Sequence, residues 1–122
     1  MDLPRRTAMK YLCLVYSDEA KLHSLPDSPK DAECLAYGEK LKASGHMLAG
    51  EALQPVHTAT TVRVRGGKRT IMDGPFAETK EQLAGFWLIE AANLDEAIDI
   101  AAGIPSARVG SIEIRPLRQL QP

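Results

Sequence analysis

The sequence lacks an excess of positive charge and lacks any long apolar run. Lysine and arginine together number 15 and aspartate and glutamate 16 among 122 residues, so the formal net charge is −1. General nucleic-acid binding depends on a surplus of basic residues that neutralise phosphates, so we expect no nucleic-acid partner. No apolar run approaches the length that spans a bilayer, so we expect no membrane association.

Cysteine is also scarce, and familiar catalytic or cofactor-binding motifs are absent. The two cysteines, Cys13 and Cys34, belong to no CxxC motif, and no histidine stands at metal-ligand spacing from either. We therefore expect two buried free thiols, a reducing cytoplasmic location and no metal site. The sequence contains no GxSxG, P-loop or GxGxxG pattern, so we expect no cofactor.

The length suits a single domain with a core of its own. We expect residues 1–8 to be an unstructured N-terminal lead and residues 9–122 to form the domain. Arg5 and Arg6 precede an apolar run, but that run is too short for a signal-peptide core and no small-residue cleavage site follows it. We interpret the run as the first strand and Met9 as an alternative natural start.

The chain contains a regular succession of strand and helix patterns. Apolar runs, alternation and turn signals predict strands, and capping residues with apolar spacing of three or four predict helices. The predicted elements are a strand at 11–16, a helix from Pro29 to Ser44-Gly45, a strand at 47–53, hairpin strands at 60–65 and 68–72, a helical turn within 77–82 capped by Thr79, a strand at 85–90, a helix at 94–102 and a strand at 111–115.

The same patterns predict which residues cap the helices and face the core. Ser28 is the expected N-cap of the first helix, and Asn93 opens the second. The expected packed positions of the first helix are Ala32, Leu35, Ala36 and Leu41. The expected packed positions of the second helix are Leu94, Ala97, Ile98, Ala101 and Ala102.

The order of the elements predicts an α+β fold. Strand, helix, strand, hairpin, strand, helix, strand is typical of the ferredoxin-like split βαβ arrangement, here with a β-hairpin insertion around Gly66-Gly67. Within the hairpin, alternation predicts that Val62 and Val64 point inward and that the arginines between them point outward. Helices at 29–44 and 94–102 can cover only one face of such a sheet.

The other face of the predicted sheet needs a partner. The strands at 11–16 and 86–89 are apolar on both faces, so the face without helices would be an exposed apolar patch. The simplest cover is a second copy of the chain, packed sheet against sheet about a two-fold axis. The sequence therefore predicts a homodimer.

The stretch from Asp73 to Glu90, DGPFAETKEQLAGFWLIE, resembles the signature of DGPF-domain proteins, relatives of the YCII-related family. The segments at 9–11, 58–63 and 112–116 are similar to that family as well, so the resemblance covers nearly the whole chain. It implies a ferredoxin-like dimeric α+β barrel with a pocket beside the DGPF loop of each protomer. Members are similar to domains found near alternative sigma factors, which implies a regulatory setting.

Asp73 is the first candidate for a catalytic role. It follows a strand and precedes Gly74-Pro75, so a sharp turn can project its carboxylate into a cleft for acid or base chemistry. Alternatively, it hydrogen-bonds its own turn. Glu78 and Lys80 in the same loop are further catalytic candidates, because a lysine among carboxylates can bind an anionic substrate. Their alternative is a solvated turn.

Four residues are candidates for substrate binding: Glu81, Tyr16, Arg63 and His57. Glu81 shares the loop of Lys80, and Tyr16 ends the first strand. Arg63 belongs to a basic hairpin that can clamp a carboxylate or phosphate, or that protects an edge strand from aggregation.

Activity in YCII-related proteins has been suggested through a His/Asp pair. His23, His46 and His57 all lie in or near loops, and none matches the histidine of that pair. His57, near the hairpin, is a candidate base, although surface histidine is the alternative for each.

Three functions follow from these residues. The first is an enzyme-like protein that binds a small molecule beside the DGPF loop. The second is a non-catalytic ligand sensor or partner-binding module, which needs the pocket but no acid–base pair. The third is RNA binding, which ranks well below because no basic residue precedes Gly85 and the sheet face is assigned to the dimer.

Overall fold

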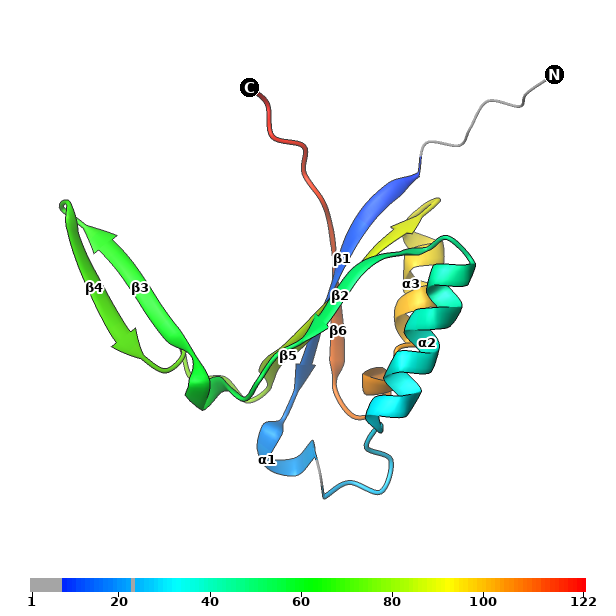
Figure 1. The fold of residues 1–122 in the computed structure, drawn as a ribbon, viewed down its shortest axis with the longest axis horizontal. Helices are drawn as coiled ribbons and strands as arrows, with labels where there is room; N and C mark the ends of the chain where they lie inside the picture. The colour runs from blue at the N-terminus through cyan, green and yellow to red at the C-terminus, as the bar shows by residue number, and fades with distance from the viewer. Residues whose placement is uncertain (1–7, 23) are drawn as a thin grey trace.

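The computed structural model describes residues 8–22 and 24–122, so most of the expected N-terminal lead lies outside the described residues. Figure 1 shows an α+β fold with a sheet, helices on one side of it and a separate hairpin on the other. The elements are β1 (Met9–Ser17), α1 (Glu19–Leu22), α2 (Asp31–Ala43), β2 (Met47–Ala52), η1 (Val56–Thr58), β3 (Thr60–Arg65), β4 (Lys68–Asp73), β5 (Gln82–Ala91), α3 (Leu94–Ala102), η2 (Pro105–Arg108) and β6 (Ser111–Pro116).

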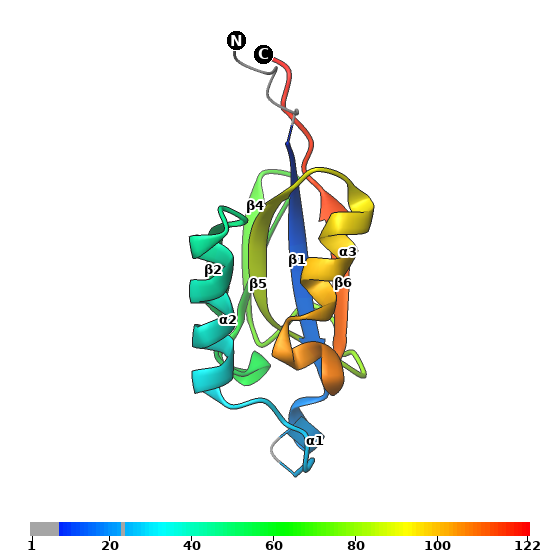
Figure 2. The same cartoon turned by 90° about the vertical axis from the view of Figure 1, so that its right-hand side faces the viewer.

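The four-stranded sheet is antiparallel and has the strand order β2-β5-β1-β6. Helix α2 connects β1 to β2, which are separated by β5, and α3 connects β5 to β6, which are separated by β1. This is the predicted split βαβ arrangement. Figure 2 shows α2 and α3 side by side over the same face of the sheet. None of the helices in the described part of the chain is long and apolar enough to cross a bilayer.

The core lies between this face and the helices. Alternate residues of β1 are buried beneath the helices, and the residues between them are only half-buried on the opposite face. Ile89 of the central strand β5 is fully buried. The buried hydrophobic residues of the core are Tyr11, Cys13, Val15, Leu41, Ile89, Ala91, Ala97, Ile100, Ala101 and Ile104.

Helix α2 begins later than predicted. Its N-cap is Lys30, whose backbone N–H donates to the Glu33 carboxylate at 3.3 Å. The Ser28 hydroxyl is used elsewhere, because it donates to the carbonyl of Leu22 and ties the preceding loop to α1. The predicted N-cap at Ser28 and helical position at Pro29 are therefore wrong.

The packed face of α2 also differs from the prediction. Leu35 is 71% exposed, whereas Gly38 and Leu41 are buried and Tyr37 is half-buried. The buried side of the helix therefore runs along Gly38 and Leu41, and the indole of Trp87 lies opposite Gly38, 3.7 Å from where an added Cβ would be.

Helix α3 follows the prediction at its start and only partly along its length. Asn93 accepts a hydrogen bond from the Glu96 N–H at 2.9 Å, as expected of an N-cap. Ala97 and Ala101 are buried, but Ile100 replaces Ile98 at the core. The helix is rotated so that the alanines fit close to the sheet. Leu94, Ile98 and Ala102 are exposed, contrary to the prediction.

Three other predictions need correction. Residues 77–82 form no helix, because Thr79 and Gln82 make turn hydrogen bonds and Gln82 already belongs to β5. Cys34 is only partly buried, unlike Cys13. Val62 and Val64 do not point into a core, since the hairpin stands away from the sheet and both side chains are exposed.

Candidate functional site: a pocket between α1 and the loop before β5

A cavity of about 460 Å³ lies beside the segment that follows the DGPF motif. It is bounded by α1 and the residues after it, by the loop before β5 and by the turn before β6. The residues that line it are Asp18, Lys21, Leu22, Leu25, Lys80, Glu81 and Val109. Its size is that of a small-molecule site.

Side-chain hydrogen bonds fix α1 at this place. The Glu19 N–H donates to the Gln82 side-chain oxygen at 3.0 Å, which joins α1 to the start of β5. The Glu19 carboxylate in turn accepts from the Val56 N–H at 3.0 Å. Asp18 accepts from the Ala20 N–H at 3.1 Å and so caps the short helix. The pocket wall is thus attached to β5 and to the segment that leads into the hairpin.

The loop before β5 forms the opposite wall. The Thr79 hydroxyl donates to the carbonyl of Glu81 at 2.6 Å, and the Gln82 side-chain amide donates to the carbonyl of Thr79 at 2.6 Å. The Glu81 carboxylate accepts from the Ser111 hydroxyl at 2.8 Å, which attaches the loop to the first residue of β6.

The charges of the pocket are not equivalent. Both carboxylates, Asp18 and Glu81, accept hydrogen bonds from the protein. The two lysines, Lys21 and Lys80, make no ion pair within residues 8–22 and 24–122. The same cavity is lined by the apolar residues Leu22, Leu25 and Val109. Such an arrangement can hold a small molecule that has an anionic group and an apolar body.

The structure brings together only part of the predicted set. Lys80 and Glu81 line the pocket, and Glu78 is exposed in the same loop without lining it. Tyr16 is half-buried and pairs with Ser111, the residue that holds Glu81. Asp73 is exposed at the end of β4, opposite Thr60, and lines neither cavity described here.

The remaining candidates lie outside the pocket. Arg63 is exposed in the middle of the hairpin, opposite Thr70. His57 is exposed within η1. His23 lies outside the described residues. No group of three or more potential metal ligands occurs within the part of the chain that the structure describes.

A second cavity, of about 430 Å³, lies between the N-terminal half of α2 and the β2–β5 edge of the sheet. Trp87, Cys34, Asp31 and Ser106 are among its lining residues. Burial raises the pKa of the Cys34 thiol, and the neighbouring Asp31 and Glu33 carboxylates raise it further. Burial raises the pKa of Cys13 to about 11. Both thiols are therefore protonated at neutral pH and are poor nucleophiles.

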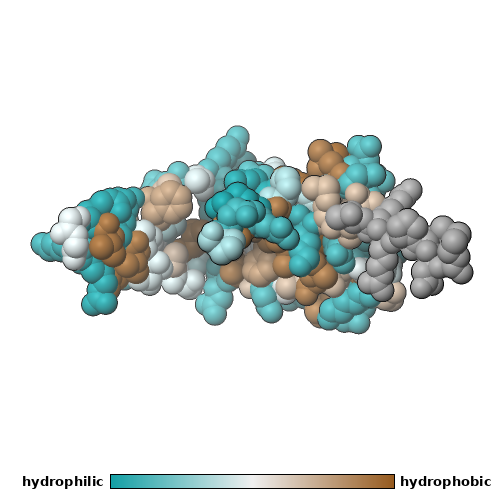
Figure 3. Space-filling view, turned by 90° about the horizontal axis from the view of Figure 1, so that it is seen from above, coloured by the Kyte–Doolittle hydropathy of each residue, from teal (hydrophilic) through white to brown (hydrophobic). Residues whose placement is uncertain are grey.

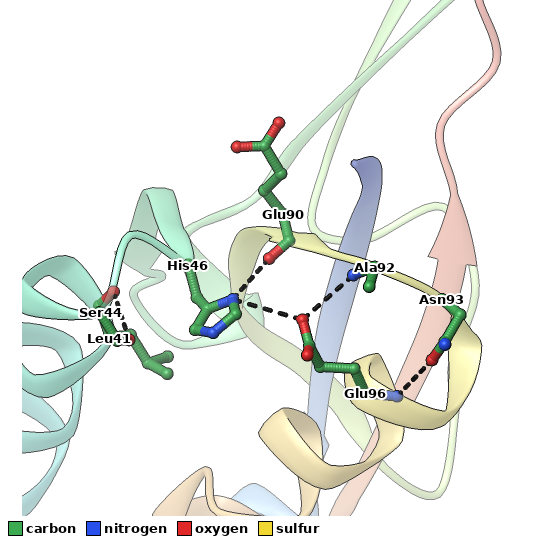
Figure 4. Close-up of polar contacts among 7 residues, drawn as sticks. All are labelled: Leu41, Ser44, His46, Glu90, Ala92, Asn93 and Glu96. Atoms are coloured by element: carbon green, nitrogen blue, oxygen red, sulfur yellow. Dashed lines mark hydrogen bonds and ion pairs between the residues drawn. The ribbon is translucent and has the colours of Figure 1, made fainter. Parts of the chain in front are cut away.

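His46 forms a separate polar cluster at the opposite end of the sheet (Figure 4). Its Nδ1 lies 2.8 Å from the carbonyl oxygen of Glu90 and 3.7 Å from the Glu96 carboxylate. That carboxylate also accepts from the Ala92 N–H at 3.1 Å. The cluster joins the turn after α2 to the turn between β5 and α3. It has no cavity beside it among the cavities described here, so we interpret it as a structural contact.

The sequence-based prediction missed Asp18, Lys21, Leu22, Leu25 and Val109. The stretch from Ser17 to Asp27 reads as polar and irregular, and a helix of four residues leaves little periodic signal. The capping residue Asp18 was the one available signal, since aspartate before a short polar run favours a helix start.

The fold and the pocket together define a small α+β protein with a ligand-sized cavity at one end of an antiparallel sheet. The chain matches the YCII-related domain over residues 9–121 and belongs to that family, as its DGPF motif predicted. It is 40% identical over 120 residues to an uncharacterised protein of Rhizobium meliloti (strain 1021). The matched region covers 93% of this chain and 96% of the relative.

Proposed function

We propose that this YCII-related protein binds a small organic anion in the pocket between α1 and the loop before β5. The observation that carries the proposal is the pair of lysines, Lys21 and Lys80, at a cavity with an apolar wall. A carboxylate or phosphate group would lie between the ammonium groups, and its apolar body would contact Leu22, Leu25 and Val109.

The geometry favours binding over catalysis. The two carboxylates of the pocket already accept hydrogen bonds from Ala20 and Ser111, and no histidine lines the cavity within the described residues. An acid–base pair for proton transfer needs a group within hydrogen-bond reach of the substrate. A ligand sensor or carrier needs none, which supports the non-catalytic alternative and the regulatory setting implied by the family resemblance.

An enzymatic role remains the second candidate function, with Lys80 in contact with the substrate and Asp73 and Glu78 as acid or base. What favours it is that all three residues belong to one stretch of the chain, residues 73–80. The free thiols of Cys13 and Cys34 support the proposed cytoplasmic location.

We also propose that the protein is a homodimer, with an α+β barrel formed by two sheets face to face. Leu12, Leu14, Phe86 and Leu88 share the sheet face that carries no helix. These side chains are only half-buried in the single chain. A contiguous apolar face of this kind is typical of an interaction surface.

Binding is tested by isothermal titration calorimetry with phosphate, butyrate, hexanoate and benzoate. We expect at least one of them to bind, and Lys80→Gln to weaken it about 10-fold or more, which corresponds to a lost charge-assisted contact of about 1.4 kcal/mol. Lys68→Gln at the hairpin tip is the matched control and should leave binding unchanged. If Lys80→Gln and Lys68→Gln bind the anion with equal affinity, the proposed pocket is contradicted. Weaker binding of the anion by Asp73→Asn would favour the enzymatic role.

A further inference from the structure

The hairpin formed by β3 and β4, residues 60–73, is an arm whose side chains, except that of Thr61, are exposed among the described residues. Opposite residues of an antiparallel pair share a face, so Val62 lies beside Ile71, and Val64 lies on the same face beside Arg69. Their side chains are 56%, 60% and 59% exposed, respectively. Figure 3 shows hydrophobic side chains gathered on the hairpin, at the left of the view.

The arm is anchored at its base and free at its tip. The Gly74 N–H donates to the carbonyl of Ala59 at 2.7 Å, and the Thr61 hydroxyl donates to the carbonyl of Gly74 at 2.8 Å. The other side-chain hydrogen bonds of residues 60–73 within the described structure stay inside the hairpin. An isolated two-stranded hairpin is at best marginally stable in water, so an arm with three exposed apolar residues on one face needs a partner surface.

The charge of the arm is opposite to that of the rest of the chain. Residues 60–73 contain four cations and one anion, a net charge of 4 − 1 = +3. The whole chain carries −1, so the remaining residues carry −1 − 3 = −4. The sheet face without helices contains two exposed carboxylates, Glu51 and Glu113, in one cross-strand row with Phe86 and Leu14. The exposed cations Lys10 and Arg115 lie on the same face, nearer the end of β1 that begins the strand.

The position of the arm points to a second copy of the chain as the occupant. Figure 1 shows the hairpin on the side of the sheet opposite the helices, at an angle to the open face. Whatever covers that face stands next to the arm. A two-fold axis would place each basic arm against the acidic body of the other copy and would use both arms equally.

We propose that the β3–β4 hairpin is a dimerisation arm, which packs the face formed by Val62, Val64 and Ile71 against the body of a second copy of this chain. This inference rests on the proposed homodimer and extends it, because the arm adds a contact outside the sheet-to-sheet surface. Arg69 lies beside Val64 on the packed face and is the cation placed to meet a carboxylate of the partner. Arg63, Arg65 and Lys68 lie on the other face and at the tip, where they add only to the long-range attraction.

The test compares two lysine substitutions at neighbouring positions on opposite faces of the arm. Sedimentation equilibrium on the full chain measures the dimer dissociation constant for wild type, Ile71→Lys and Thr70→Lys. We expect Ile71→Lys to raise it at least about 30-fold, because a charge replaces a buried apolar contact. Thr70→Lys adds the same charge on the other face and should change it less than about 3-fold. Circular dichroism checks that both variants keep the fold.

Each other outcome is informative. A wild-type dimer that both variants leave intact would retain the sheet-to-sheet proposal and overturn the arm. A wild-type monomer at every concentration would overturn both. A third outcome is a dimer that is insensitive to Ile71→Lys, together with slower hydrogen exchange of the arm when a single-stranded oligonucleotide is added. That outcome would identify nucleic acid as the occupant of the arm and overturn the inference.

Hydrogen exchange on the unmodified chain is an independent measurement. The backbone amides of residues 60–73 should exchange more slowly above the dimer dissociation constant than below it, while core amides of β5 should change less. Exchange of the arm that does not depend on protein concentration would contradict the proposal even if every arm variant failed to fold.

Discussion

The body of the molecule and the β3–β4 hairpin contain similar strands in opposite surroundings. Strand β1 is apolar on both faces and buries Cys13 and Val15 beneath two helices, whereas β3 alternates Val62 and Val64 with arginines and exposes both valines. In the hairpin, β-branched residues and a two-residue glycine turn are enough to define the strands locally. Burial depends on what packs against the strand, and the described residues outside the hairpin leave both of its valines exposed.

The largest expected effect on stability comes from replacing an isoleucine with alanine, once in the body and once in the hairpin. Ile89→Ala removes a fully buried side chain from β5 and should lower the free energy of unfolding by about 3 kcal/mol or more. Ile71→Ala in the hairpin, where the side chain is 60% exposed, should lower it by less than about 0.5 kcal/mol in the monomer. Urea unfolding at low protein concentration, followed by the fluorescence of Trp87, measures both.

A dependence on concentration would sharpen this contrast. If the arm binds a second copy, Ile71→Ala should become destabilising as the protein concentration rises above the dimer dissociation constant. An equal loss for Ile71→Ala and Ile89→Ala at low concentration would mean that the hairpin folds onto its own body, which would contradict the distinction.

Glycine substitutions probe the same contrast through the backbone. In the body, an added Cβ at Gly85 would lie 2.6 Å from the carbonyl oxygen of Glu51 in the paired strand β2. We expect Gly85→Ala to lower the free energy of unfolding by about 2 kcal/mol, because backbone atoms of a central strand cannot move aside easily.

The matched change in the hairpin is Gly67→Ala. Gly67 has a φ of 75° and nothing within 4 Å of an added Cβ. The cost is therefore only that of the left-handed conformation, about 1 kcal/mol, and it should fall on the hairpin alone. Thermal unfolding measures the global effect, and hydrogen exchange of residues 60–73 measures the local one. If Gly67→Ala lowered the free energy of unfolding more than Gly85→Ala, the hairpin would not be independent of the body.

The sequence predicted the hairpin strands and the family well because their signals are local. Gly66 and Gly67 both have positive φ, as the turn requires, and the alternation on either side gave the correct pairing. Asn93 was identified for the same reason, since an N-cap bonds to a residue three positions away.

The packed faces of the helices were predicted less well because they depend on distant residues. Leu35 was assigned to the core from its spacing, yet its side chain is exposed, and the helix buries Gly38 opposite the indole of Trp87. The pocket has the same difficulty, because Lys21 and Lys80 come from segments far apart in the sequence, which the hydrogen bond from the Glu19 N–H to Gln82 holds together. The family motif identified the loop of Lys80, and nothing in the spacing identified its opposite wall.

A smaller effect concerns the histidines. His46 in the body bonds to the Glu90 carbonyl oxygen at 2.8 Å and joins two turns, whereas His57 near the hairpin base is exposed. His46→Ala should lower the free energy of unfolding by about 1 kcal/mol, the typical loss of one hydrogen bond, and His57→Ala by less than about 0.5 kcal/mol. Urea unfolding of the two variants compares them, and an equal change would show that the His46 contact contributes nothing.

The smallest expected effect is on the pH dependence of stability, and it comes from a pair of surface charges in the body. Arg108 donates to the Glu33 carboxylate at 2.9 Å, and this bond holds the pKa of Glu33 below its ordinary value of 4.5. A lowered pKa in the folded state gives stability that is present above pH 4.5 and is lost as the pH falls through the folded-state pKa. Glu33→Gln should therefore flatten the acid limb of stability against pH slightly. Arg108→Gln should flatten it less, because the Lys30 N–H still donates to the Glu33 carboxylate in that variant. The double variant should match Glu33→Gln alone, because both lack that carboxylate. Additive losses in the double variant, measured by urea unfolding between pH 3 and pH 6 (a range chosen about the ordinary carboxyl pKa), would mean that the two side chains act separately.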